Sequence, residues 1–141
     1  MKKLNNKKGF TIVELVIVIA VIGILAGVLI PTFSSIVGKA NASAAQQTAA
    51  NALKIVLAEV AGTENNFTSA TFYVLDSNKN VEYTVSYTNG ELGSANEATE
   101  TKAITEYAVS GKTYYAKESV GAGTTKVVAD MPANVVVIPG N

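Results

Sequence analysis

A single carboxylate lies in the apolar N-terminal part of the chain. Glu14 stands near the start of an apolar run that continues to Ile30 without another charged residue. A carboxylate at the centre of a membrane span costs roughly 2.5 to 3.5 kcal/mol on insertion scales, and less near an interface. A charge kept at this position therefore indicates a function, and the chemistry open to it is pairing with a cationic group.

The residues before Glu14 carry positive charge. Four lysines precede Gly9, and the apolar run follows directly: they are Lys2, Lys3, Lys7 and Lys8. A basic stretch ahead of a long apolar segment is typical of a signal peptide or a membrane anchor. Residues 1–9 are thus predicted to be a leader held in the cytoplasm by its lysines.

The stretch Lys8-Gly9-Phe10-Thr11-Ile12-Val13-Glu14-Leu15 resembles the class III leader of type IV prepilins and pseudopilins. The resemblance implies cleavage between Gly9 and Phe10 by a prepilin peptidase, followed by methylation of the new amine at Phe10. It also implies that Glu14 acts in subunit assembly with Phe10. Pro31 matches the proline that commonly interrupts the helix just past the apolar core.

The apolar run has the length of a membrane span. Phe10 to Ile30 is 21 residues, and at 1.5 Å per residue it covers roughly 31 Å, close to a hydrocarbon core of about 30 Å. Pro31 removes a backbone donor, which predicts a kink or a short unwound stretch between Gly27 and Gly38. The expected organisation is a cleaved leader at 1–9, an apolar transmembrane and filament-core helix at 10–33, and a globular headgroup at 34–141.

The headgroup is expected to have an α+β fold, with a long kinked helix whose second half covers a small antiparallel sheet of about four strands. Apolar residues at three and four spacing predict a helix from Ser34 to about Ala61, stopped by Gly62. Its predicted packing face consists of Ala45, Ala49, Ala52, Leu53, Val56, Leu57 and Val60. The strand candidates are 71–75, 81–88, 103–109, 112–116, 127–128 and 135–138. Turns are predicted at 76–80 and at Asn89-Gly90, a second hairpin turn at Ser110-Gly111, and a loop at 91–102.

Composition excludes several classes of function. The 141 residues contain no His and no Cys, so thiolate sites and histidine catalysis are absent, and no motif places a carboxylate pair. We expect no enzyme activity, no cofactor and no metal; a calcium-like stretch at 76–80 lacks the required Gly and Glu. Removal of the leader leaves 7 lysines and 11 acidic residues, and this acidic balance gives no sign of nucleic-acid binding.

Three classes of function remain. The first is a pilin that polymerises into a helical surface filament, and its chemistry suits a Gram-positive major pilin because the chain has lysines without arginine and no cysteine. The second is a pseudopilin of a type II secretion or DNA-uptake system. The third is an ordinary anchored or secreted protein, cut by a signal peptidase near Ala40-Asn41-Ala42. For the favoured pilin, the resemblance implies three kinds of partner: a prepilin peptidase and methyltransferase, an assembly platform with its ATPase, and further copies of the chain. It also implies a precursor that crosses the cell membrane once and a mature chain that is assembled into a pilus on the cell surface.

Overall fold

The computed structural model describes residues 9–61, 68–107, 112–121 and 123–140. The contacts divide the chain into two units, residues 1–38 and residues 39–141. Helix α1 (Ile12–Val60) contributes residues to both units. The elements that follow α1 all belong to the second unit.

In the first unit, α1 exposes apolar side chains on all its sides. None of the described side chains from Gly9 to Gly38 is buried. Pro31 lies inside α1, and the helix continues through the whole range from Gly27 to Gly38. The expected unwound stretch is therefore wrong, whereas a bend of the helix at Pro31 stays a prediction.

Two hydroxyl side chains near Pro31 donate to backbone carbonyls of the helix. The Thr32 hydroxyl donates to the Val28 carbonyl at 2.8 Å, and the Ser35 hydroxyl donates to the Thr32 carbonyl at 3.2 Å. Pro31 removes only one backbone donor, and hydroxyl donors next to a proline help to satisfy carbonyls inside a helix. One lost hydrogen bond is thus too small a perturbation to end an apolar helix here.

In the second unit, α1 covers one face of the sheet with small residues. Its buried positions are spaced by three and four: they are Ala45, Ala49, Ala52, Val56 and Val60. This is the face predicted from the sequence, and alanine at three of the five positions lets the helix axis lie close to the strands. Leu57, also predicted on that face, instead has 41% of its surface exposed. Gly62 lies outside the described residues.

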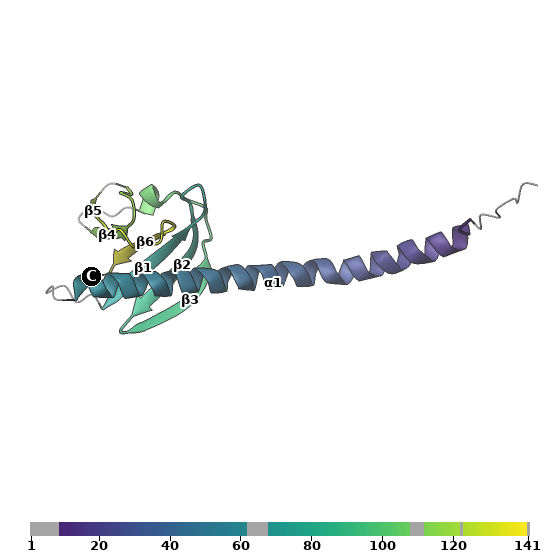
Figure 1. Ribbon diagram of the computed structural model, residues 1–141, viewed down its shortest axis with the longest axis horizontal. Helices are drawn as coiled ribbons and strands as arrows, with labels where there is room; N and C mark the ends of the chain where they lie inside the picture. Colours follow the sequence, from purple (N-terminus) through teal and green to yellow (C-terminus); the bar gives the residue numbers. More distant parts are fainter. Residues whose placement is uncertain (1–8, 62–67, 108–111, 122, 141) are drawn as a thin grey trace, which may run out of the picture. The chain divides into compact units, whose positions relative to one another are not determined.

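The sheet has six strands in place of the four expected (Figure 1). They are β1 (Ser69–Leu75), β2 (Val81–Thr88), β3 (Glu91–Glu97), β4 (Thr113–Ala116), β5 (Thr124–Val127) and β6 (Val135–Pro139). Their order across the sheet is β3-β2-β1-β6-β4-β5. All neighbouring pairs are antiparallel except β4 and β5, which are parallel.

The hairpins of β1, β2 and β3 follow from turn chemistry. Asp76 Oδ1 accepts hydrogen bonds from the backbone nitrogens of Asn78 and Asn80 at 2.8 and 2.9 Å, and this forms the predicted turn after β1. Asn89 and Gly90 both have positive φ, 49° and 94°. Two consecutive residues of that kind form a type I′ turn, whose twist matches a two-residue hairpin.

Strand β3 corrects the prediction of a loop over residues 91–102. Its residues are small and polar and mostly exposed, so their composition carries no strand signal. The tight turn at Asn89-Gly90 nevertheless brings Glu91–Glu97 beside β2, and Gln46 of α1 donates to the Gly93 carbonyl at 3.1 Å. Backbone pairing imposed by the turn, rather than burial of side chains, makes this segment a strand.

A second correction concerns the strand predicted at 103–109. Ile104–Tyr107 forms the 3-10 helix η1, and the hairpin expected at Ser110-Gly111 lies outside the described residues. Ile104 is buried against the sheet face opposite α1, so a single turn serves to cover that face. The remaining strand candidates at 112–116, 127–128 and 135–138 correspond to β4, the end of β5 and β6.

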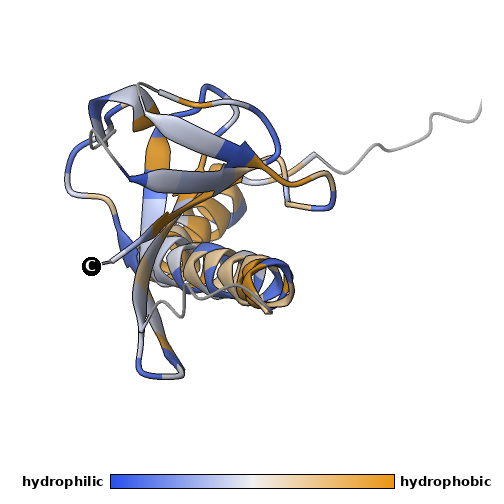
Figure 2. Ribbon diagram, turned by 90° about the vertical axis from the view of Figure 1, so that its left-hand side faces the viewer, coloured by the Kyte–Doolittle hydropathy of each residue, from blue (hydrophilic) through white to orange (hydrophobic). Residues whose placement is uncertain are grey.

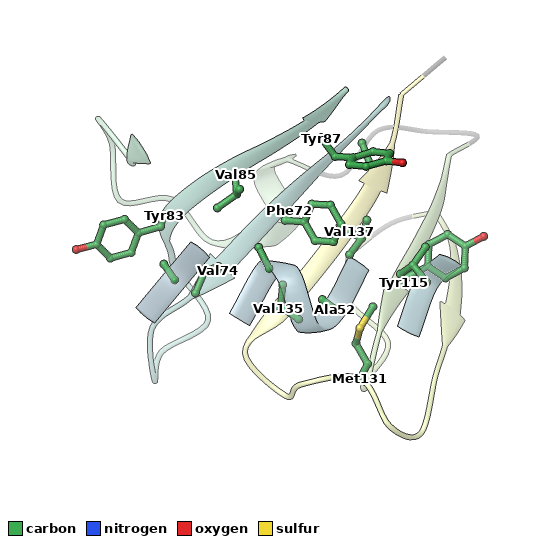
Figure 3. Packing of buried hydrophobic residues seen from close by; sticks show 14 of the residues in the cluster. Ala52, Phe72, Val74, Tyr83, Val85, Tyr87, Tyr115, Met131, Val135 and Val137 are labelled. Atoms are coloured by element: carbon green, nitrogen blue, oxygen red, sulfur yellow. The ribbon is translucent and has the colours of Figure 1, made fainter. Parts of the chain in front are cut away.

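Two apolar clusters lie on the two faces of the sheet. The larger one packs α1 on the sheet and includes Phe72, Val85, Met131 and Val137 (Figure 3). The smaller one, on the other face, includes Val81, Ile104, Tyr114 and Val136. The turn between β2 and β3, at the bottom of Figure 2, is hydrophilic and extends away from both clusters.

Candidate processing and assembly site

The predicted cleavage junction lies just before the helix. Gly9 and Phe10 precede Ile12, the first helical residue, and both are exposed. The Phe10 side chain has 93% of its surface exposed, and a Cβ added to Gly9 would meet no atom within 4 Å. The fold of the chain therefore places no steric demand for glycine at this position. Any requirement for Gly9 comes from a molecule that acts on the chain.

Thr11 and Glu14 form a reciprocal cap at the start of α1. The Thr11 backbone nitrogen and hydroxyl both donate to Glu14 Oε2 at 2.9 Å, and the Glu14 backbone nitrogen donates to the Thr11 hydroxyl at 3.3 Å. This is a capping box, which satisfies backbone donors that have no partner inside the helix. The Thr-x-x-Glu spacing could have indicated this cap, but the sequence reasoning assigned no role to Thr11.

The cap fixes the orientation of Glu14. Its carboxylate lies at the N-terminal end of the helix, where the macrodipole favours a negative charge. Both Thr11 bonds end on Oε2, and no hydrogen bond of the described residues ends on Oε1. In this chain the Phe10 nitrogen is part of the peptide bond to Gly9, so the expected pairing of Glu14 with a Phe10 amine stays a prediction.

The rest of the first unit is an apolar surface that no described residue of that unit covers. Helix α1 contains a stretch long and apolar enough to cross a membrane, and none of that stretch is buried. Gly23, Gly27 and Gly38 are helical, and a Cβ at any of them would meet nothing within 4 Å. Glycine inside a helix costs about 1 kcal/mol relative to alanine. Contacts within the first unit thus give no reason for these glycines, whereas close approach of another helix would.

These features define a class of protein, in which a basic N-terminal stretch precedes a long helix that is apolar at its start and packs on an α+β head farther along. Comparison with known families gives the finer assignment. Residues 4–30 match the family model described as the prokaryotic N-terminal methylation motif. Over this stretch the chain is similar to type IV pilins that carry this motif.

Curated relatives resemble the chain over the same N-terminal region. The chain is 48% identical over 42 residues to a fimbrial protein of Moraxella nonliquefaciens, covering 30% of this chain and 27% of the relative. It is 47% identical over 38 residues to a type IV major alpha-pilin of Moraxella bovis, covering 27% and 24%. The match thus spans about a quarter of the length of these relatives. They give no support to the expected Gram-positive source, and no solved structure matches the chain significantly.

Proposed function

We propose that the chain is the structural subunit of a type IV pilus, cleaved after Gly9, methylated at Phe10 and polymerised through its apolar helix into a surface filament. The observation that carries this proposal is the apolar surface of the first unit, which none of the described residues of that unit covers. Such a helix requires lipid or other helices around it. The lipid of the membrane would surround it before assembly, and copies of the same helix would surround it in the filament.

The geometry of the cap supports a role for Glu14 in assembly. Cleavage would create an ammonium at Phe10, and an assembled apolar helix bundle would take both that charge and the Glu14 carboxylate out of water. An unpaired charge in such a place costs about 3 to 5 kcal/mol, so the two charges need to pair. The cap occupies Oε2, and no hydrogen bond of the described residues ends on Oε1. The proposed partner is the Phe10 amine of the neighbouring copy, which would fix the axial register of the helices.

A role as the structural subunit of a filament agrees with the similarity to pilins. It also requires other proteins for processing and assembly. Pilins are structural and not enzymes, and the names of the relatives, fimbrial protein and type IV major alpha-pilin, favour a pilus over a secretion-system pseudopilin. The proposed partners are further copies of the chain, the prepilin peptidase and methyltransferase, and an assembly platform with its ATPase. The proposed locations are the membrane for the precursor and the cell surface for the pilus, where the filament would serve adhesion, motility or biofilm formation.

Processing gives a direct test. Mass spectrometry of the N-terminus of surface material is expected to show a chain that starts at Phe10 with one added methyl group. Gly9→Leu is expected to leave uncut protein in the membrane, because the enzyme and not the fold requires glycine there. Gly38→Leu is the matched control, since a Cβ at Gly38 also meets nothing within 4 Å. Intact Met1, or a start near Ala42, would overturn the proposal.

Filament formation is the second part of the test. Electron microscopy of material sheared from cells is expected to show filaments when the chain is present and none when its gene is deleted. Restoring the gene is expected to restore the filaments. Unchanged filaments in the deletion strain would show that another protein is the structural subunit.

A further inference from the structure

The first unit contains a backbone carbonyl that its own helix leaves without a backbone donor. In an α-helix the carbonyl of Gly27 accepts a hydrogen bond from the nitrogen four residues later, but that residue is Pro31, which has no N–H. The hydroxyl of Thr32 donates to the carbonyl of Val28, and no side-chain hydrogen bond of the described residues ends on the Gly27 carbonyl. An acceptor of this kind is satisfied by water in solution and is unfavourable where water is excluded. The Gly27 carbonyl therefore requires a donor once lipid or other helices surround α1.

The side of the helix at Gly27 is open to a neighbour. Gly27 is exposed, and a Cβ added to it would meet no atom within 4 Å. Glycine is unfavourable inside a helix, and the contacts of the first unit give no reason for it here. The missing side chain uncovers the backbone and lets another helix approach closely. Gly27 thus combines an acceptor that lacks a backbone donor with a surface that a second helix can reach.

Hydroxyl groups are the side-chain donors of the described residues 9–38. Three of the four donate to acceptors of the same helix: they are Thr11, Thr32 and Ser35. The fourth, Ser34, is exposed and makes no hydrogen bond with any described residue. Ser34 lines an apolar groove of about 720 Å³ together with Phe33, Ile36 and Val37. The first unit therefore has one unused donor, in an apolar groove, and one carbonyl that lacks a backbone donor.

We propose that the Ser34 hydroxyl of one copy of the chain donates a hydrogen bond to the Gly27 carbonyl of a neighbouring copy in the filament. The proposal rests on the proposed function, because it takes a polymer of the chain as its setting. Ser34 cannot reach the carbonyl of its own chain, since seven residues of helix separate the two by roughly 10 Å. The occupant of the groove at Ser34 is therefore the α1 helix of a second copy, placed with its turn at Gly27 against the hydroxyl.

The contact agrees with the register proposed for Glu14 and Phe10. Pairing of Glu14 in one copy with the Phe10 amine of its neighbour displaces the two parallel helices by about four residues, or roughly 6 Å. Ser34 of the first copy then lies level with Ile30 of the neighbour. A helix carbonyl points toward the C-terminal end of its helix, so the oxygen of Gly27 lies close to that level. One displacement thus satisfies both contacts, and because they are about 30 Å apart along the helix, they fix the register at both ends of the apolar segment.

Reconstruction of native filaments by electron cryo-microscopy tests the contact directly. The expected distance from the Ser34 hydroxyl oxygen of one copy to the Gly27 carbonyl oxygen of a neighbour is about 2.5 to 3.0 Å. A separation beyond hydrogen-bond range in every pair of neighbouring copies would overturn the proposal. Absence of filaments from cells that make the unaltered chain would instead overturn the proposed function, and the contact with it.

Removal of the hydroxyl provides the second test. Ser34→Ala is expected to lower the ratio of filament to membrane pool by about five- to thirtyfold, because an enclosed acceptor loses its donor. Ser34→Thr keeps a hydroxyl and is expected to stay within about twofold of the unaltered chain. Ser43→Ala, the same change at an exposed position of α1 in the second unit, is the control and is expected to leave the ratio unchanged. A normal ratio from Ser34→Ala would refute the contact.

Pro31→Ala distinguishes this hydrogen bond from any other role of Ser34. Alanine at position 31 supplies the missing N–H to the Gly27 carbonyl, so Ser34→Ala is expected to change the ratio by less than about twofold in that background. An equal loss in both backgrounds would show that Ser34 acts in another way and would overturn the proposal. If Pro31→Ala forms no filaments, the reconstruction and the two Ser34 variants decide between the contact and its absence.

Discussion

Substitution of Glu14 can separate its two possible roles, because glutamine preserves one of them. Glutamine at this position can still accept from Thr11 and complete a capping box, but it carries no charge. Valine loses both the cap and the charge. Thr11→Ala weakens the cap and keeps the charge. The three variants together therefore assign the function of Glu14 to the cap or to the charge.

The structure sets the size of each effect. Loss of a cap residue costs about 0.5 to 2 kcal/mol, so Thr11→Ala is expected to reduce filament assembly by at most about thirtyfold. Loss of the charge leaves the ammonium of Phe10 unpaired in an apolar environment, at about 3 to 5 kcal/mol. Glu14→Gln and Glu14→Val are thus both expected to reduce assembly by roughly a hundredfold to several-thousandfold.

The assay compares three pools in the same cells. Filaments are sheared off and quantified, the membrane pool is quantified by immunoblot, and mass spectrometry reports whether each variant is cleaved. Both Glu14 variants are expected to be cleaved normally and to accumulate in the membrane. If Glu14→Gln assembles like the unaltered chain while Glu14→Val fails to assemble, the cap alone explains the role of Glu14 in assembly. Normal assembly of both would leave apolar packing as the whole driving force.

Three further predictions concern the headgroup. A chain that begins at Ser34 is expected to be soluble and folded by circular dichroism, and monomeric by sedimentation. If it failed to fold, or formed filaments without the apolar segment, the first part of α1 would not be the assembly segment and the second part would not belong to an independent headgroup. In that chain, Phe72→Ala is expected to lower the free energy of unfolding, measured in urea, by about 3 to 5 kcal/mol, because Phe72 is fully buried. The control Ser86→Ala, at an exposed position, should change this free energy by less than about 0.5 kcal/mol. A hydrogen bond from Lys79, and then its charge, lower the pKa of Glu118 below 4.5, so the ion pair stabilises the fold at neutral pH and is lost as the pH falls through that lowered value. The thermal midpoint of Glu118→Gln should therefore lie slightly below that of the unaltered chain at pH 7, and the difference should shrink as the pH is lowered. A difference that grows at low pH would refute this assignment.

The sequence predicts best those elements whose side chains alternate or whose turns demand particular backbone angles. Strand β2 has the predicted bounds, and its burial alternates along its length because every second side chain faces a core. The turn at Asn89-Gly90 was also predicted, since asparagine and glycine adopt positive φ at little cost. In both cases the information is local to a few neighbouring residues.

Other elements depend on partners that are distant in the sequence. Strand β3 has no apolar pattern and forms because β2 offers it an edge. The parallel pairing of β4 with β5 could not be inferred from either segment alone, since each is only four residues long. The cap formed by Thr11 is a different case. The Thr-x-x-Glu spacing that indicates it is present in the sequence, but Glu14 was interpreted only through its charge.

The position of β6 has a consequence for the order in which the headgroup becomes structured. Strands β1, β2 and β3 follow one another as hairpins, but β4 and β5 join them in the sheet only through β6. The pair formed by Phe72 and Val137 closes a loop of more than sixty residues, and such distant pairing is slow to form. Because a chain is made from its N-terminus onward, the strand that links the two halves of the sheet is the last of the six to leave the ribosome. Until then the strand that joins β1 to β4 is missing, so closure of the six-stranded sheet depends on Val135–Pro139.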